Sequence, residues 1–76
     1  MREELINLIA EICEEDEIIT NPDMDIVGAD LLDSMAFAEL LVAIEDEFGV
    51  VISPSEVDRK VLNTPEKIVS FVMERM

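Results

Sequence analysis

The residue with the clearest chemical potential is Ser34, which follows Asp33 at the point where a helical pattern begins. A hydroxyl on a first helical turn projects into solvent beside unpaired backbone N–H groups, which favours an attached phosphate or phosphodiester. No nearby His or Lys in the sequence could activate this hydroxyl as a nucleophile. We therefore expect Ser34 to be modified by another enzyme rather than to act as a catalyst.

The rest of the chain offers few groups for catalysis or metal binding. The sequence contains no histidine, the commonest catalytic base and metal ligand. Cys13 is the single cysteine, which excludes an internal disulfide and a cysteine zinc site. It falls on the apolar face of a predicted helix, so we interpret it as a small core residue rather than a reactive thiol. The sequence therefore predicts no metal site and a protein that is not an enzyme.

A helix that begins at Asp33 would present Ser34 in this way. The Asp33 carboxylate can accept hydrogen bonds from the free N–H groups of the first turn, and its charge suits the positive end of the helix dipole. We predict that this helix ends near Phe48, with Gly49 directly after its last turn. At about 100° per residue, one sector of the helix collects five apolar side chains that face inward. These are Phe37, Leu40, Leu41, Ile44 and Phe48.

The opposite face of the same helix mixes apolar and acidic side chains, and we call it the outer strip. Its members are Met35, Ala38, Glu39, Val42, Glu45 and Asp46. Apolar groups ringed by carboxylates indicate a docking surface that selects a basic partner. The alternative is that these are scattered exposed apolar residues of the kind that any small protein carries.

Two segments precede this helix. Residues 2–15 show helical spacing and predict an amphipathic helix with an apolar face formed by Leu5, Leu8, Ile9 and Ile12. Residues 16–33 lose the helical period but keep many apolar side chains. Structureless loops beyond about 12 to 15 residues are uncommon in a compact domain, so this one should have a role or contain a short helical turn. We expect the loop to run across the ends of the helices.

Two shorter helices are predicted after Gly49. Residues 50–52 favour a strand but have no second strand to pair with, so we expect an extended loop. Ser53 to Glu56 match a capping box with proline at the first helical position, which predicts a short helix over about 54–60. Thr64 and Pro65 repeat this start for a last helix that continues to the C-terminus. The predicted fold is all-α, a small four-helix bundle of three longer helices and one short helix, in a single domain over 1–76.

Composition and charge exclude several classes of function. The 76 residues include 19 acidic and five basic side chains, for a formal net charge of −14, and half of the chain is hydrophobic. This balance suits an acidic folded domain and opposes binding to nucleic acid or anionic lipid. No segment has the roughly 20 apolar residues needed to span a bilayer, and Glu3 and Glu4 stand where a signal peptide would be basic. We therefore expect a cytoplasmic protein that does not insert into membranes.

The segment around Ser34 resembles the acyl carrier protein family. The resemblance covers nearly the whole chain and rests mainly on Leu32-Asp33-Ser34-Met35, Glu39-Leu40-Leu41 and Ile44-Glu45-Asp46-Glu47-Phe48. It implies that Ser34 carries 4′-phosphopantetheine and that Met35 and Val42 guide partners. The implied partners are a phosphopantetheinyl transferase, a charging ligase, and an acceptor transferase or synthase. The implied protein is a monomer that holds an acyl or aminoacyl group as a thioester.

Within the family, the resemblance extends to the D-alanyl carriers of lipoteichoic acid D-alanylation. It rests on Leu31-Leu32-Asp33-Ser34-Met35, Ser55-Glu56-Val57-Asp58-Arg59 and Asn63-Thr64-Pro65-Glu66-Lys67-Ile68. The chain departs from that pattern where Ala36-Phe37 replaces Gly-Thr, Val57 replaces an aromatic residue and Leu62 replaces a tryptophan. The resemblance implies D-alanine as cargo, with fatty-acid, polyketide and peptide-synthetase carriers as alternatives. An inward-facing Phe37 would narrow any cavity for a long acyl chain, which favours a small aminoacyl cargo.

Two other classes of function compete with a carrier. Asp23 to Gly28 begin like a calcium-binding EF-hand loop, but Val27 and Ser34 stand at its fifth and twelfth positions, where oxygen-donating ligands such as Asp and Glu are needed. An acidic interaction domain without a prosthetic group, such as a nucleic-acid mimic, fits the charge equally well. It does not explain why a serine precedes the outer strip, so the carrier is preferred.

The charge itself makes a prediction that is independent of cargo. Nineteen carboxylates around a small core repel one another, and small domains have little stability in reserve. Added salt screens this repulsion, so the melting temperature should rise between low and moderate salt. A thermal melt followed by circular dichroism measures the change. An unchanged or lower melting temperature would contradict the prediction.

Overall fold

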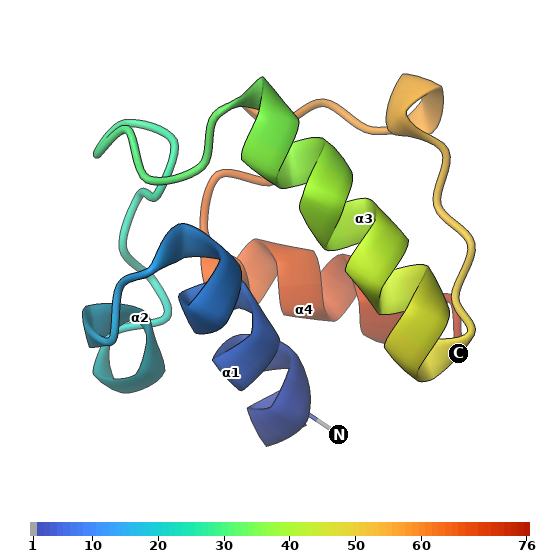
Figure 1. The fold of residues 1–76 in the computed structure, drawn as a ribbon, viewed down its shortest axis with the longest axis horizontal. Helices are drawn as coiled ribbons and strands as arrows, with labels where there is room; N and C mark the ends of the chain where they lie inside the picture. Colours follow the sequence, from blue (N-terminus) through green and yellow to red (C-terminus); the bar gives the residue numbers. More distant parts are fainter. Residues whose placement is uncertain (1) are drawn as a thin grey trace.

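The computed structural model describes residues 2–76, in which every regular element is helical (Figure 1). The α-helices are α1 (Arg2–Cys13), α2 (Glu17–Thr20), α3 (Ser34–Phe48) and α4 (Pro65–Glu74), and a 3₁₀ helix, η1, spans Pro54–Glu56. Helix α1 packs against α2, α3 and α4. The predicted all-α class and small helical bundle are confirmed.

The core lies between α1, α3 and α4, and the predicted inward stripe of α3 contributes to it. Phe37, Leu40, Leu41 and Ile44 are buried, and Phe48 is half-buried against the core. On α1 the buried face is broader than predicted, because this helix contacts three others. Leu5 and Ile9 are buried as expected, and Leu8 and Ile12 are half-buried. The prediction missed the buried side chains of Ile6 and Ala10.

Cys13 belongs to the core, as the sequence indicated. Its side chain is buried at the end of α1, and burial raises the pKa of the thiol to about 11. A thiol with such a pKa carries almost no thiolate at neutral pH, and the thiolate is the reactive form. Cys13 therefore acts as a small apolar residue.

The long loop between α1 and α3 contains the helical turn that its length suggested, namely α2. Backbone hydrogen bonds tie this loop to the N-terminal end of α4. The Ile26 N–H donates to the Asn63 carbonyl at 2.9 Å, and the Glu66 N–H donates to the Pro22 carbonyl at 2.9 Å. Ile18 and Ile26 belong to this loop, and both side chains are fully buried in the core. The loop crosses the start of α4 before it reaches α3, which agrees with the expectation that it runs across helix ends.

The predicted helix over about 54–60 is wrong in length. Only Pro54–Glu56 are helical, and Val57 returns to an extended backbone. The capping box is present, because Ser53 and Glu56 satisfy each other's backbone N–H groups. Asp58 then accepts a hydrogen bond from the Lys60 N–H at 2.9 Å. This local bond competes with helix continuation and turns the chain toward α3.

Candidate functional site

The start of α3 is fixed by the side chain of Asp33. Its Oδ1 accepts a hydrogen bond from the Ala36 N–H at 2.8 Å, while its backbone is extended. The helix ends at Phe48, and Gly49 follows with a left-handed φ of 69° and donates its N–H to the Glu45 carbonyl. Both predicted ends of this helix are confirmed. Ser34 is therefore the first residue of a helix with defined ends.

Ser34 is exposed and lines an open surface hollow of about 350 Å³. Phe37, Pro54, Val57, Asp58 and Arg59 complete the lining. The first N–H groups of a helix, here those of Ser34 and Met35, have no acceptor within the helix. The hydroxyl thus combines solvent access with a partial positive charge from the helix end.

Arg59 brings a full positive charge to the same hollow. Its Nη1 donates a hydrogen bond of 2.8 Å to the carbonyl of Leu32, two residues before Ser34. Figure 1 shows the start of α3 beside the segment that connects η1 to α4. The sequence carries no signal for this role of Arg59, because helical periodicity contains no information about a contact between two loops 27 residues apart.

These residues fit a covalently attached phosphodiester. The Ser34 hydroxyl is accessible to a modifying enzyme, and the hollow beside it opens to solvent. A phosphodiester is an anion, and the Arg59 guanidinium is a donor that suits phosphate. The local chemistry therefore agrees with the arm that the resemblance implied.

The six residues of the outer strip are all exposed on α3. Met35 and Val42 keep 75% and 58% of their surface exposed, so the strip presents two large apolar side chains on the same helix face. Two hollows flank Ala38 and Val42: one of about 130 Å³ reaches Ile52 and Pro54, and one of about 380 Å³ reaches Asp46. The structure thus brings the predicted strip together on one face with concave edges.

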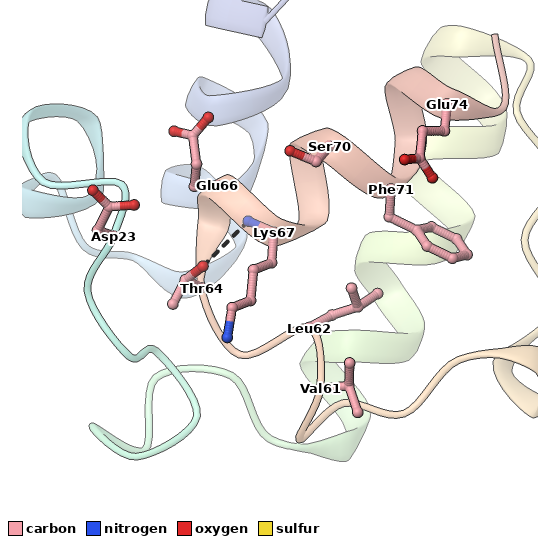
Figure 2. A pocket seen from close by; sticks show the side chains of 9 residues that line it. All are labelled: Asp23, Val61, Leu62, Thr64, Glu66, Lys67, Ser70, Phe71 and Glu74. Carbon is pink, nitrogen blue, oxygen red and sulfur yellow. Dashed lines mark hydrogen bonds between the residues drawn. The ribbon is translucent and has the colours of Figure 1, made fainter.

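The largest hollow lies elsewhere, along α4 and the segment before it. It has a volume of about 620 Å³, and Figure 2 shows Val61, Leu62 and Phe71 on one side of it and Thr64 and Lys67 on another. Neither Ser34 nor any residue of the outer strip lines it. Size alone therefore does not identify the site, and the chemistry points to the smaller hollow beside Ser34.

In the loop that resembles a calcium site, the Asp25 carboxylate accepts hydrogen bonds from backbone N–H groups of the same loop. Asp25 Oδ1 accepts hydrogen bonds from the N–H groups of Gly28 at 2.7 Å and Val27 at 3.1 Å. The Gly28 bond is the main reason that the pKa of Asp25 lies below its usual value. Among residues 2–76, no three His, Cys, Asp or Glu side chains are arranged to hold a metal ion. None of the helices described is long and apolar enough to cross a bilayer.

Comparison with known proteins agrees with this chemistry. Residues 3–72 match the family described as phosphopantetheine attachment site. The chain is 44% identical over 73 residues to the D-alanyl carrier protein of Bacillus velezensis and 41% identical over 73 residues to that of Bacillus subtilis. Both alignments cover 96% of this chain and 94% of the relative. The D-alanyl carrier protein of Enterococcus faecalis is 36% identical over 72 residues, which cover 95% of this chain and 92% of that protein.

The helix cap at Asp33 can be tested by substitution. Asp33→Ala removes the acceptor for the Ala36 N–H and should lower the free energy of unfolding by about 1 kcal/mol. Asp33→Asn is the matched control, because asparagine also caps helices and loses only the charge that suits the helix dipole. Urea unfolding measures both variants. An equal loss of unfolding free energy in Asp33→Ala and Asp33→Asn would show that Asp33 stabilises the helix through its charge and not through the capping hydrogen bond.

Proposed function

The chain belongs to the phosphopantetheine-attachment family of carrier proteins, and from this premise we propose that Ser34 is the residue that carries its 4′-phosphopantetheine. The observation that carries the proposal is the exposed Ser34 hydroxyl at the first position of the capped helix α3. Asp33 supports this role by holding the first turn in place. When attached, the arm supplies a terminal thiol on which the cargo is held as a thioester.

The protein contributes position and recognition, and its partners contribute catalysis. We propose that it has no turnover of its own: it contains no histidine, and its single thiol lies buried in the core. A phosphopantetheinyl transferase would modify Ser34, a ligase would charge the arm, and an acceptor transferase or synthase would receive the cargo. Residues 1–76 would act as one monomeric carrier domain in the cytoplasm, where coenzyme A is available to the transferase.

The proposed cargo is D-alanine for teichoic acid D-alanylation. The relatives reported above carry the name D-alanyl carrier protein at 36–44% identity. The hollow beside Ser34 adds a physical argument, since it is lined by the charged Asp58 and Arg59 and by Phe37, which is only 6% exposed. Charged side chains at this entrance disfavour a long acyl chain, because an apolar chain gains little there and would desolvate them. A small aminoacyl cargo needs no such cavity.

The outer strip is the proposed docking surface for these enzymes. Val42 and Met35 supply apolar contact, and the hollows on either side of Ala38 and Val42 can accept apolar side chains of a partner. Glu39, Glu45 and Asp46 surround them with negative charge. The matching partner surface is basic with one or two projecting apolar side chains, because opposite charges steer the encounter and apolar contacts slow dissociation.

The attachment residue can be identified by intact mass. Incubation with coenzyme A and a broad-specificity phosphopantetheinyl transferase should add one phosphopantetheine to the wild type and none to Ser34→Ala. Charging of the product with a D-alanine-activating ligase and ATP should then add one D-alanyl group, which hydroxylamine removes from a thioester.

A lack of mass gain on the folded wild type would reject the carrier and favour the acidic interaction domain. Modification of the Ser34→Ala variant would reject Ser34 as the attachment residue. Loading by a fatty-acyl ligase in preference to D-alanine would reject the proposed cargo while leaving the carrier intact.

The docking surface can be tested with a matched pair of valines. Val42→Ser should raise the KM of the transferase or ligase for the carrier by about 5- to 10-fold, as expected for a central contact worth about 1 kcal/mol or more, with kcat nearly unchanged. Val51→Ser is the control, because Val51 is also exposed, at 67% against 58% for Val42, but lies after the end of α3. Similar KM values for the two variants would place the docking surface elsewhere.

A further inference from the structure

Arg59 is held beside Ser34 although it lies 25 positions later in the chain. Its side chain is half-buried, and its Nη1 is bound at 2.8 Å to the Leu32 carbonyl. Consecutive Cα atoms are about 3.8 Å apart, so the Cα atoms of Leu32 and Ser34 lie within about 7.6 Å of each other. Arg59 and Ser34 also line the same hollow. The guanidinium is therefore a fixed charge close to the serine.

The guanidinium retains donors for a second acceptor. An arginine side chain presents five N–H donors in a planar fork, and one nitrogen is engaged with the Leu32 carbonyl. The fork geometry suits two oxygens of one phosphate, which a lysine ammonium cannot match. Among residues 2–76, Arg59 is the one basic residue that lines this hollow.

The other basic side chains are committed elsewhere or lie outside the hollow. Arg2 pairs with Glu66, and Arg75 pairs with Glu56 and stacks over Phe71. The Lys67 ammonium donates to the Asn63 side chain at 3.0 Å. Lys60 is exposed and does not line the hollow, which leaves Arg59 as the basic side chain that borders it together with Ser34.

Two carboxylates lie near this hollow, and their negative charge would repel a phosphate attached at Ser34. Asp58 lines it, although its Oδ1 accepts the Lys60 N–H, and Asp33 lies next to Ser34, although its Oδ1 accepts the Ala36 N–H. An attached phosphodiester adds another negative charge to a chain that already has a net charge of −14. Without a cation beside it, the new charge would be repelled by both carboxylates.

We propose that Arg59 forms a phosphodiester-binding subsite, in which its guanidinium donates to the phosphate oxygens of the arm attached at Ser34 while it remains bound to the Leu32 carbonyl. This inference rests on Ser34 as the attachment residue. The subsite directs the first part of the arm toward the 57–62 segment, and the charge of Arg59 offsets the repulsion of the phosphate by Asp33 and Asp58. Arg59 is a positioning residue, and the chemistry of charging stays with the partner enzymes.

The test compares Arg59→Gln, Arg59→Lys and Lys60→Gln in the apo and phosphopantetheine-loaded forms. Lys60→Gln is the matched control, because it removes the same charge from the neighbouring exposed residue. In the wild type, loading should shift the Arg59 Nε–H resonance. The ³¹P resonance of the loaded arm should move in Arg59→Gln, move less in Arg59→Lys and stay unchanged in Lys60→Gln.

Thermal melts give an independent measure. The change in melting temperature on loading should be about 1–4 °C less favourable in Arg59→Gln than in the wild type, because the loaded variant lacks one partly exposed ion pair. The loss of the Leu32 contact cancels in this difference, because it affects the apo and loaded forms alike.

Unchanged ³¹P and Arg59 Nε–H resonances, or an effect of Lys60→Gln as large as that of Arg59→Gln, would overturn the subsite. Intact mass separates this failure from failure of the carrier function. A mass gain on Ser34 in every variant leaves the carrier standing, whereas no gain on the wild type rejects both.

Discussion

The position of Ser34 depends on two neighbouring oxygens that accept hydrogen bonds where the long loop becomes α3. The Leu32 carbonyl accepts from Arg59, and the Asp33 carboxylate accepts from the Ala36 N–H. The first bond ties the loop to the 57–62 segment, and the second defines the first turn of the helix. Ser34 follows directly, so its direction is set by both. Because the outer strip lies on the same helix, its orientation relative to Ser34 is fixed by the geometry of α3.

Acidic and basic side chains are placed differently in this fold. Most carboxylates are left on the surface, whereas the three arginines join parts of the chain that are distant in sequence, as in the Arg2–Glu66 and Arg75–Glu56 pairs. Exposed pairs of this kind contribute little stability each. The fold therefore rests on its buried apolar side chains, and the excess negative charge remains available to attract basic partners.

The elements that the sequence predicted well are those whose signals are local. Helix α3 combines a capping Asp33, a regular apolar stripe and a terminal Gly49, and helix α4 begins with Thr64 and Pro65 as expected. The helix over 54–60 failed because a hydrogen bond of the Asp58 side chain competes with helix formation. The breadth of the α1 core face and the Arg59–Leu32 contact depend on tertiary packing, which periodicity does not encode. The proposal for Ser34 rests on local signals and a family resemblance, and the structure adds its exposure at the first position of α3.

The short helix η1 lies between the hollow beside Ser34 and the hollow beside Val42. Pro54 lines both the hollow beside Ser34 and the hollow beside Val42. The proline ring fixes the φ angle of Pro54, and the capping box of Ser53 and Glu56 closes the turn. On the roles proposed for Ser34 and for the outer strip, Pro54 therefore borders both the attachment residue and the docking surface. A partner seated on the outer strip would then contact an element that also lines the hollow beside Ser34.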